Sequence, residues 1–232
     1  MQARKAGIVD LGVSNITSVV NAFSAAGCDC KIITEDEPQK SVDVLVLPGV
    51  GHHGYLAPKL QNSPIKQIIV SHYEQGNPVI GICLGMQILF EGSAESEHQG
   101  LGLMAGEVRD LNRLVAERDV RKVPNIGYGY TKINAVSGSK RVGKITEYSN
   151  YYYFLHSYAL LAREIYHNCD IFGETDFAGV SICGMFIKDN LSGLQFHPER
   201  SGKAGLELIS ELIKYLCDFG GCPAACYAGA KK

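Results

Sequence analysis

The first half of the chain alternates short apolar runs with amphipathic stretches, and this alternation constrains the fold more than any other feature. The pattern predicts strands at 7–11, 31–34, 42–47 and 79–83, and helices at 15–26, 64–73 and 84–90. Strands that alternate with helices build parallel βαβ units, with helices on both faces of the sheet. The first half therefore predicts an α/β fold with a parallel sheet.

The second half has a different pattern, in which helical periodicity is scarce until the end. Strands are predicted at 103–111, 130–134, 151–158, 170–175, 181–187 and 194–197, and an amphipathic helix at 205–219. We expect antiparallel strands that extend the first sheet or form a small second one. No linker rich in Pro or Ser separates the halves, so residues 1–219 are expected to form one domain, with 220–232 as a loose tail.

The composition excludes several classes of protein. A chain of 232 residues with 46% hydrophobic residues can bury a large core, and a net charge of −2 argues against a nucleic-acid binder. The longest nearly apolar run, 78–90, is shorter than the roughly 20 residues of a membrane-spanning helix. With no secretory signal and eight cysteines without framework spacing, we expect a reduced, cytoplasmic protein that does not associate with membranes.

The most informative segment joins the strand at 79–83 to the helix after it. Gly81-Ile82-Cys83-Leu84-Gly85 has the spacing of a nucleophile elbow, with cysteine in place of serine. The glycines permit the sharp turn, the helix N-terminus favours a thiolate, and the N–H of Leu84 would face a developing oxyanion. The alternative interpretation is a buried structural cysteine between two packing glycines.

A cysteine nucleophile needs a base and a group that orients the base. The segment 194–200, LQFHPER, offers both, because His197 and Glu199 stand two residues apart at a predicted strand end. A carboxylate beside an imidazole fixes its tautomer and raises its pKa. A lone histidine is more often structural, so His197 gains its significance from Cys83.

Two further segments fit a site at the carboxyl edge of the sheet. LPGVGHHG at 47–54 follows a predicted parallel strand, and its glycines let backbone amides approach a ligand. LHSY at 155–158 ends an aromatic run, whose first residues are more simply explained by packing within the sheet. The alternative for 47–54 is an ordinary turn, because no complete phosphate-binding motif is present. No cysteine spacing makes a convincing metal site.

These residues resemble the class I, triad-type glutamine amidotransferases, and more closely the glutaminase-subunit family of imidazole glycerol phosphate synthase. The matching segments run nearly end to end in the family's order. They are IVDLGVSN at 8–15, LPGVG at 47–51, GICLGMQILF at 81–90, KVPNIGYGY at 122–130, HSY at 156–158 and QFHPERSG at 195–202. The resemblance implies a single domain with a flavodoxin-like three-layer sandwich and a mostly parallel central sheet.

The resemblance also implies roles for individual residues, and it implies neither a cofactor nor a metal. Cys83, His197 and Glu199 would form a catalytic triad that hydrolyses L-glutamine to glutamate and ammonia. Backbone amides of Leu84, Val50 and Gly51 would form the oxyanion hole. The glutamine-binding residues would be Gly51, Gln87, Ser157 and Tyr158.

The family passes its ammonia to a cyclase-type (β/α)8-barrel subunit, which implies a heterodimer. The segment that faces this partner would include Pro124, Asn125, Gly127 and Tyr128. Here the chain departs from the family's P-H-M-G-W-N, because both the His and the Trp are replaced, and Arg200 stands where the family often has Lys. These departures leave open a paralogous glutaminase that supplies a sugar amidotransferase of surface-polysaccharide biosynthesis. A non-catalytic regulatory relative and a cysteine hydrolase fit the motifs less well.

Overall fold

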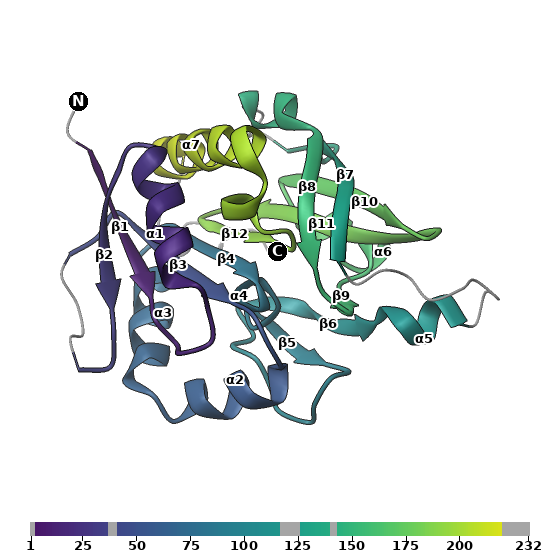
Figure 1. Cartoon of the computed structure of the whole chain (residues 1–232), viewed down its shortest axis with the longest axis horizontal. Coiled ribbons are helices and arrows are strands. Elements are labelled where there is room, and N and C mark those ends of the chain that lie inside the picture. Colours follow the sequence, from purple (N-terminus) through teal and green to yellow (C-terminus); the bar gives the residue numbers. More distant parts are fainter. Residues whose placement is uncertain (1–2, 37–40, 117–125, 140–142, 220–232) are drawn as a thin grey trace, which may run out of the picture.

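The computed structural model describes residues 3–36, 41–116, 126–139 and 143–219. Within these ranges nine strands form one sheet, in the order β2-β1-β3-β4-β12-β11-β10-β7-β8 (Figure 1). The strands are β1 (Arg4–Val9), β2 (Cys28–Ile33), β3 (Val44–Gly49), β4 (Val79–Cys83), β7 (Ile126–Ala135), β8 (Asn150–Leu155), β10 (Ile171–Phe177), β11 (Val180–Lys188) and β12 (Leu191–Leu194). The predicted tail, 220–232, lies outside the described residues.

The sheet has a parallel half and an antiparallel half that meet at β12. From β2 to β12 all neighbouring strands pair in parallel, as the alternation of the first half predicts. From β12 to β8 all pairs are antiparallel, so the expected extension of the first sheet is confirmed. The sheet is therefore mixed, and β12 has a parallel neighbour, β4, on one side and an antiparallel neighbour, β11, on the other.

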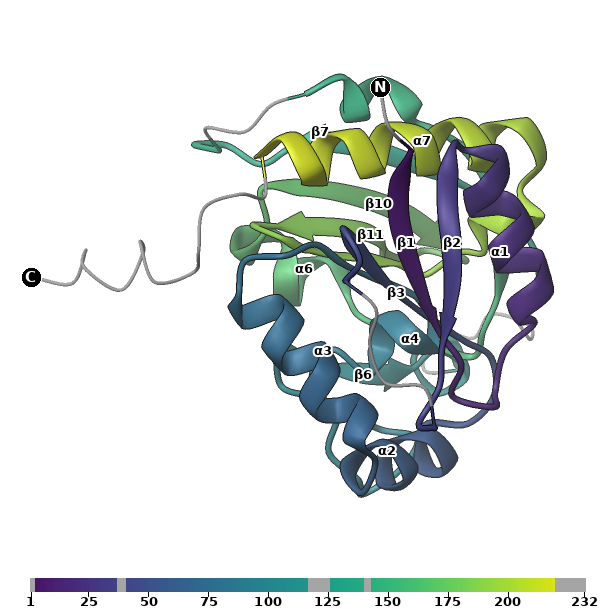
Figure 2. The same ribbon diagram turned by 90° about the vertical axis from the view of Figure 1, so that its left-hand side faces the viewer.

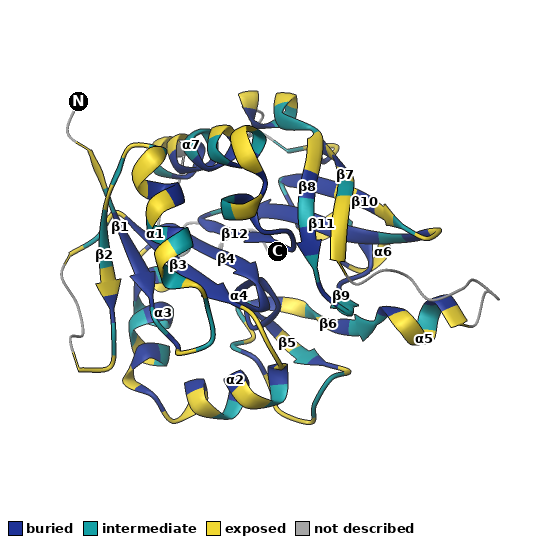
Figure 3. Ribbon diagram, viewed as in Figure 1, coloured by how far each residue is buried: buried dark blue, intermediate teal, exposed yellow. Residues whose placement is uncertain are grey.

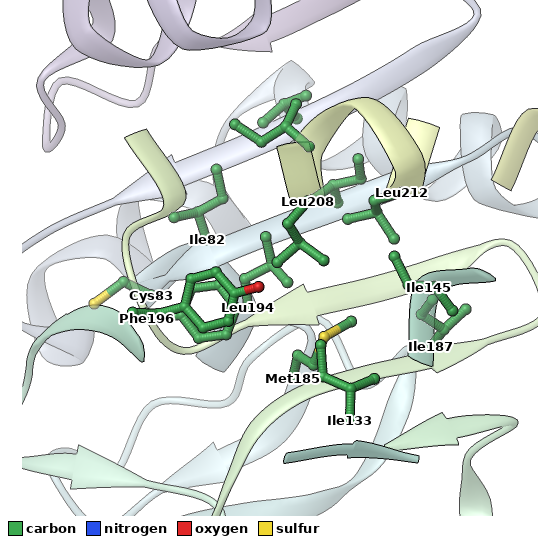
Figure 4. Packing of buried hydrophobic residues seen from close by; sticks show 14 of the residues in the cluster. Ile82, Cys83, Ile133, Ile145, Met185, Ile187, Leu194, Phe196, Leu208 and Leu212 are labelled. Carbon is green, nitrogen blue, oxygen red and sulfur yellow. The ribbon is translucent and has the colours of Figure 1, made fainter. Parts of the chain in front are cut away.

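Helices cover both faces, because side chains alternate between the faces along each strand. Val44 and Val46 of β3 pack in the cluster that includes α1 (Ile16–Ala25) and α7 (Gly202–Phe219). Leu45 and Leu47 pack on the other face, with α2 (His53–Gln61) and α3 (Pro64–Glu74). Figure 2 shows these two helical layers on opposite sides of the sheet. Figure 4 shows Leu208 and Leu212 of α7, which pack in the cluster that contains Val44 and Val46.

A small second sheet stands beside the large one. It consists of β5 (Phe90–Ser93), β6 (Met104–Asp110) and β9 (Tyr158–Ala159). The shorter elements are α4 (Leu84–Gln87), α5 (Leu111–Ala116), α6 (Ala162–Ile165), and the 3-10 turns η1 (Lys144–Tyr148), η2 (Tyr166–Asn168) and η3 (Pro198–Arg200). Strands of the second half therefore extend the first sheet and also contribute to a small second sheet, so both expected alternatives occur.

Several predicted boundaries differ from the structure. The helix predicted at 84–90 ends at Gln87, because the carbonyls of Ile88 and Leu89 accept hydrogen bonds from the chain at 101–104. The strand predicted at 194–197 overlaps β12 only at Leu194, because β12 spans Leu191–Leu194 and residues 195–197 are not in a strand. Helix α2 was not predicted, since it begins inside a glycine-rich segment and contains Pro58. Among the described helices, none is long and apolar enough to cross a membrane.

Candidate active site

The register between β4 and β12 brings together the two most informative sequence segments. These strands are parallel neighbours, and Ile82 pairs with Leu194. The next residues along the chain are Cys83, which ends β4, and Gln195, which directly follows β12. They are 112 positions apart in the sequence, and the side-chain amide of Gln195 lies 3.8 Å from Cys83 Sγ. Both strands end at the same edge of the sheet, so the predicted nucleophile and base segments share that edge (Figure 1).

The turn at Cys83 has the strained backbone that the sequence motif predicts. Cys83 has φ 54° and ψ −111°, in the left-handed region that an L-residue rarely adopts. A Cβ on Gly81 would lie 2.5 Å from the carbonyl oxygen of Gly85, and one on Gly85 would lie 1.7 Å from that of Leu47. Both glycines are therefore required by close backbone approach at this turn.

His197 and Glu199 form a buried pair. The carboxylate Oε1 of Glu199 lies 2.8 Å from Nδ1 of His197, and their side chains are 6% and 2% exposed. His197 is fixed by its backbone N–H, which donates to the Tyr153 carbonyl at 2.8 Å. Glu199 lies in η3 rather than on a strand, but it reaches the imidazole as the spacing predicts.

The electrostatic environment favours the protonated form of His197. Burial alone lowers its pKa, but the interactions with Cys83 and Glu199 outweigh burial and raise the pKa to about 10. Since Nδ1 is engaged by Glu199, Nε2 is the ring nitrogen left for Cys83. His197 thus lies between Cys83 and Glu199 and interacts with both.

A cavity of about 340 Å³ opens beside Cys83. All four residues predicted to bind glutamine line it. Its lining consists of Gly51, Cys83, Leu84, Gln87, Glu95, Ile126, Leu155, His156, Ser157 and Tyr158. A larger cavity of about 740 Å³ lies near α6 and contains none of the predicted site residues. The smaller cavity is therefore the one that fits the chemistry of Cys83.

The three predicted backbone donors are in different situations. Leu84 and Gly51 line the cavity, and Gly51 has φ 121°, which favours glycine. The N–H of Val50 instead donates to the Val13 carbonyl at 2.7 Å, so it is engaged away from the cavity. Another cavity, of about 130 Å³, is lined by Val50, His197 and Glu199 among others.

Gln195 is a site residue that the sequence reasoning did not single out. Gln87 Nε2 donates to the Tyr158 carbonyl at 2.9 Å and to Gln195 Oε1 at 3.1 Å, and Gln195 Nε2 faces Cys83 Sγ. Gln195 is fully buried. Its position two residues before His197, on the same side of an extended segment, was the available signal.

Glu95 and His156 also line the cavity without having been predicted. Burial lowers the pKa of His156 to about 3, so this imidazole is neutral, and within the described part of the chain neither of its ring nitrogens has a hydrogen-bond partner. The LHSY motif contained His156 without indicating its role. Glu95 comes from a polar stretch with no motif, so only the fold reveals it.

The predicted partner-facing segment is exposed where the structure describes it. Gly127 and Tyr128 lie on β7, and Pro124 and Asn125 lie outside the described residues. Tyr128, Tyr130, Tyr151 and Tyr153 form edge-to-face pairs across β7 and β8, and we call these four side chains the tyrosine surface. Figure 3 shows exposed residues along both strands. The surface reaches the site, because the Tyr128 hydroxyl donates to the Arg200 carbonyl at 3.2 Å.

Neither a metal site nor a disulfide is found in the part that the structure describes. No three His, Cys, Asp or Glu side chains of the described residues are grouped so that they could hold a metal ion. The six described cysteines are free thiols, and Cys28 and Cys30 belong to them.

Comparison with known proteins places the chain in a class. Residues 7–214 match the family model described as glutamine amidotransferase class-I. The solved structure of PurLQS from Thermotoga maritima has the same fold, with a TM-score of 0.65 and 18% identity over 94% of this chain and 99% of that one. The chain is thus a class-I glutamine amidotransferase, an enzyme class that hydrolyses glutamine.

Curated relatives narrow the class to one subunit type. The imidazole glycerol phosphate synthase subunit HisH of Thermus thermophilus is 35% identical over 91% of this chain and 98% of its own length. The subunit of the same name from Pyrobaculum aerophilum is 37% identical over 89% of this chain and 96% of its own. The chain belongs to the HisH family.

Proposed function

We propose that the chain is the glutaminase subunit of imidazole glycerol phosphate synthase in histidine biosynthesis. The observation that carries the proposal is Cys83, held at a left-handed strand–helix turn, next to the buried His197–Glu199 pair and beside a cavity. The HisH relatives span nearly the whole chain, so the proposal concerns the whole protein. Residues 1–219 would form its glutamine amidotransferase domain, in the cytoplasm.

The reaction follows from this arrangement in two steps. The Cys83 thiolate attacks the carboxamide carbon of glutamine, and the N–H of Leu84 donates to the resulting oxyanion. His197 then protonates the amine, so that the C–N bond breaks and ammonia leaves a thioester on Cys83. In the second step His197 takes a proton from water, which attacks the thioester and releases glutamate and the thiolate. Glu199 orients His197 throughout.

The cavity offers complementary groups for the rest of the substrate. Gln87, Ser157 and Tyr158 supply polar atoms, and the Glu95 carboxylate can accept the α-ammonium group of glutamine. An ammonium group that leaves water needs an opposite charge, and Glu95 is the carboxylate among the described lining residues. We therefore assign Glu95 to the glutamine site together with the four residues that the sequence predicted.

The oxyanion hole would be completed when the partner binds. The Val50 N–H points to Val13 in the isolated chain, so it becomes a donor to the oxyanion only after the peptide between Gly49 and Val50 turns. Glycine at positions 49 and 51 allows such a turn. Glutaminase activity that depends on the partner is the expected consequence.

Ammonia released into water would be protonated and lost, so it has to pass directly to the enzyme that uses it. The partner proposed is a cyclase-type (β/α)8-barrel subunit. Three members of the tyrosine surface are exposed, and Tyr153 is half-buried. We assign this surface, together with the exposed Arg200 next to the triad, to the contact with the partner. Exposed tyrosines are enriched at interfaces, where they lose little conformational entropy. Tyr128, which departs from the family pattern, belongs to this surface.

The paralogue that supplies a sugar amidotransferase is not favoured. The two HisH relatives described above align with 91% and 89% of this chain, and both are named as imidazole glycerol phosphate synthase subunits. Adding a cognate cyclase with its ligand should raise ammonia release sharply. If only a sugar amidotransferase had this effect, the partner assigned here would be wrong.

The nucleophile is tested by substitution and labelling. Cys83→Ala should lower glutamine hydrolysis by about a thousandfold or more, and should abolish labelling by a glutamine-mimicking electrophile. Cys30→Ala is the control, because this thiol lies on β2 at the far edge of the sheet. Unchanged hydrolysis by Cys83→Ala would contradict the mechanism.

A further inference from the structure

The start of α2 is tied to the turn that carries Glu95. The ring of His53 is fully buried, and its Nδ1 lies 2.9 Å from the Ser96 hydroxyl. The backbone N–H of His53 donates to Glu95 Oε2 at 2.6 Å. One oxygen of the Glu95 carboxylate is therefore bound to the first residue of a helix, whose N-terminus favours a negative charge.

His52 faces the other oxygen of the same carboxylate. It is the N-cap of α2, and its Nδ1 accepts the Gly54 N–H at 3.0 Å. A ring nitrogen that accepts carries no proton, so the proton of a neutral His52 is on Nε2. That nitrogen lies 3.9 Å from Glu95 Oε1, so a neutral His52 presents its N–H toward the carboxylate without a direct hydrogen bond. His53 thus binds one carboxylate oxygen, and His52 lies beside the other.

The start of α2 packs closely against the turn at Ser96, although the His52 side chain itself is 60% exposed. A Cβ on Gly54 would lie 3.0 Å from the Cβ of Ser96 and 3.1 Å from His52 Nδ1. Glycine at this position is what lets the turn approach the helix. The Glu95 side chain is 10% exposed, so water does little to hold its carboxylate, and the protein groups fix its direction.

We propose that His52, His53 and Ser96 are positioning residues that hold the Glu95 carboxylate where the α-ammonium group of glutamine binds. The inference rests on the proposed function and goes further, because it explains how the site selects its substrate. Because Glu95 and Cys83 line the same cavity, an α-amino carboxamide that contacts both groups at once is retained. A carboxamide without the α-ammonium group gains nothing from the cluster.

Two mild variants test this in the complex with the cyclase subunit. Ser96→Ala removes the partner of the His53 ring, and His52→Asn keeps an N-cap side chain but removes Nε2. Each should raise KM for glutamine about tenfold with kcat changed less than about twofold, since a contact with the non-reacting end of the substrate is weakened. For glutaramate, which lacks the α-amino group, neither KM nor kcat should change.

The controls separate a positioning role from a structural one. Glu95→Gln should remove the preference for glutamine over glutaramate, and His98→Ala, an exposed histidine two residues after Ser96, should have no effect. Equal losses on both substrates, or a fall in kcat at unchanged KM, would overturn the proposal. Failure of the proposed function would be distinct, because wild type and Cys83→Ala would then release ammonia equally.

Discussion

Cys83 combines backbone strain with burial, and this combination distinguishes it from the other described thiols. Its φ of 54° costs an L-residue on the order of 1–2 kcal/mol, which the packing around the turn has to offset. Cys169 and Cys183 are also buried, but burial raises their thiol pKa values, and neither has an imidazole–carboxylate pair beside it. These differences support the proposal that Cys83 is the nucleophile.

The charge state of His197 leads to a prediction for Glu199. Glu199→Gln removes one of the two groups that raise the pKa of His197, so this pKa should fall from about 10 toward the ordinary value of 6.5. Nitrogen NMR of the labelled imidazole measures the change directly. A pKa that stays near 10 in the variant would show that Cys83 alone controls it.

The same shift predicts how stability depends on pH. The pKa of His197 is higher in the folded state, so protonation stabilises the fold fully below about pH 6.5, and this contribution is lost as the pH rises toward 10. Because Glu199→Gln weakens the contribution, the variant should be less stable than wild type near pH 6 and approach it near pH 10. Urea unfolding at both pH values gives the difference.

Single residues differ in how far sequence could reveal them. Cys83, His197 and Glu199 stand in short motifs whose spacing reflects local geometry, and the structure brings them together. Gln195 and Glu95 act through contacts that exist only after distant segments approach, one across β4 and β12 and one between α2 and the turn before β6. For Gln195 the local pattern gave only its place two residues before His197, and for Glu95 it gave nothing, so the fold was needed to find both.

At the scale of elements, the strand–helix turn depends on glycine at position 85. A Cβ there would overlap the Leu47 carbonyl of β3, which cannot move without shifting the strand. Gly85→Ala should therefore destabilise the fold by about 3 kcal/mol, measured by urea unfolding. Gly92→Ala on β5 is the matched control, because a Cβ there meets nothing within 4 Å. Equal stability of the two variants would contradict this view of the turn.

The elements that sequence predicted well are those with long, regular periodicity. Helix α3 and strand β4 match their predicted ranges closely, and the apolar face of α7 was evident although the helix begins three residues earlier. Helix α2 was missed because its glycine and proline are typical of loops, while His52 supplies the cap. The start of α2 also contains His52 and His53, to which we assign the positioning of Glu95. The irregular sequence that hides this helix from prediction is therefore the one to which we assign a role in substrate binding.

At the scale of the whole molecule, the proposed contact with the cyclase leads to a prediction for the tyrosine surface. Tyr128 is 62% exposed and next to Arg200, so Tyr128→Ala should weaken binding of the cyclase subunit about tenfold or more. Ile32→Ala on β2 should leave binding unchanged, because this exposed residue lies on the opposite edge strand. Titration calorimetry of the two subunits compares them, and equal affinities would exclude Tyr128 from the contact.

The junction of the two halves at β12 has a consequence for the order of events in folding. Cys83 and Gln195 meet only when 112 positions of intervening chain have been closed into a loop, an entropy cost of about 4 kcal/mol. The parallel strands β1 to β3 close shorter loops and can assemble earlier. Catalytic competence should therefore be the last property to return when the denatured chain is diluted into buffer. A newly made chain would therefore not hydrolyse glutamine until β4 and β12 have paired.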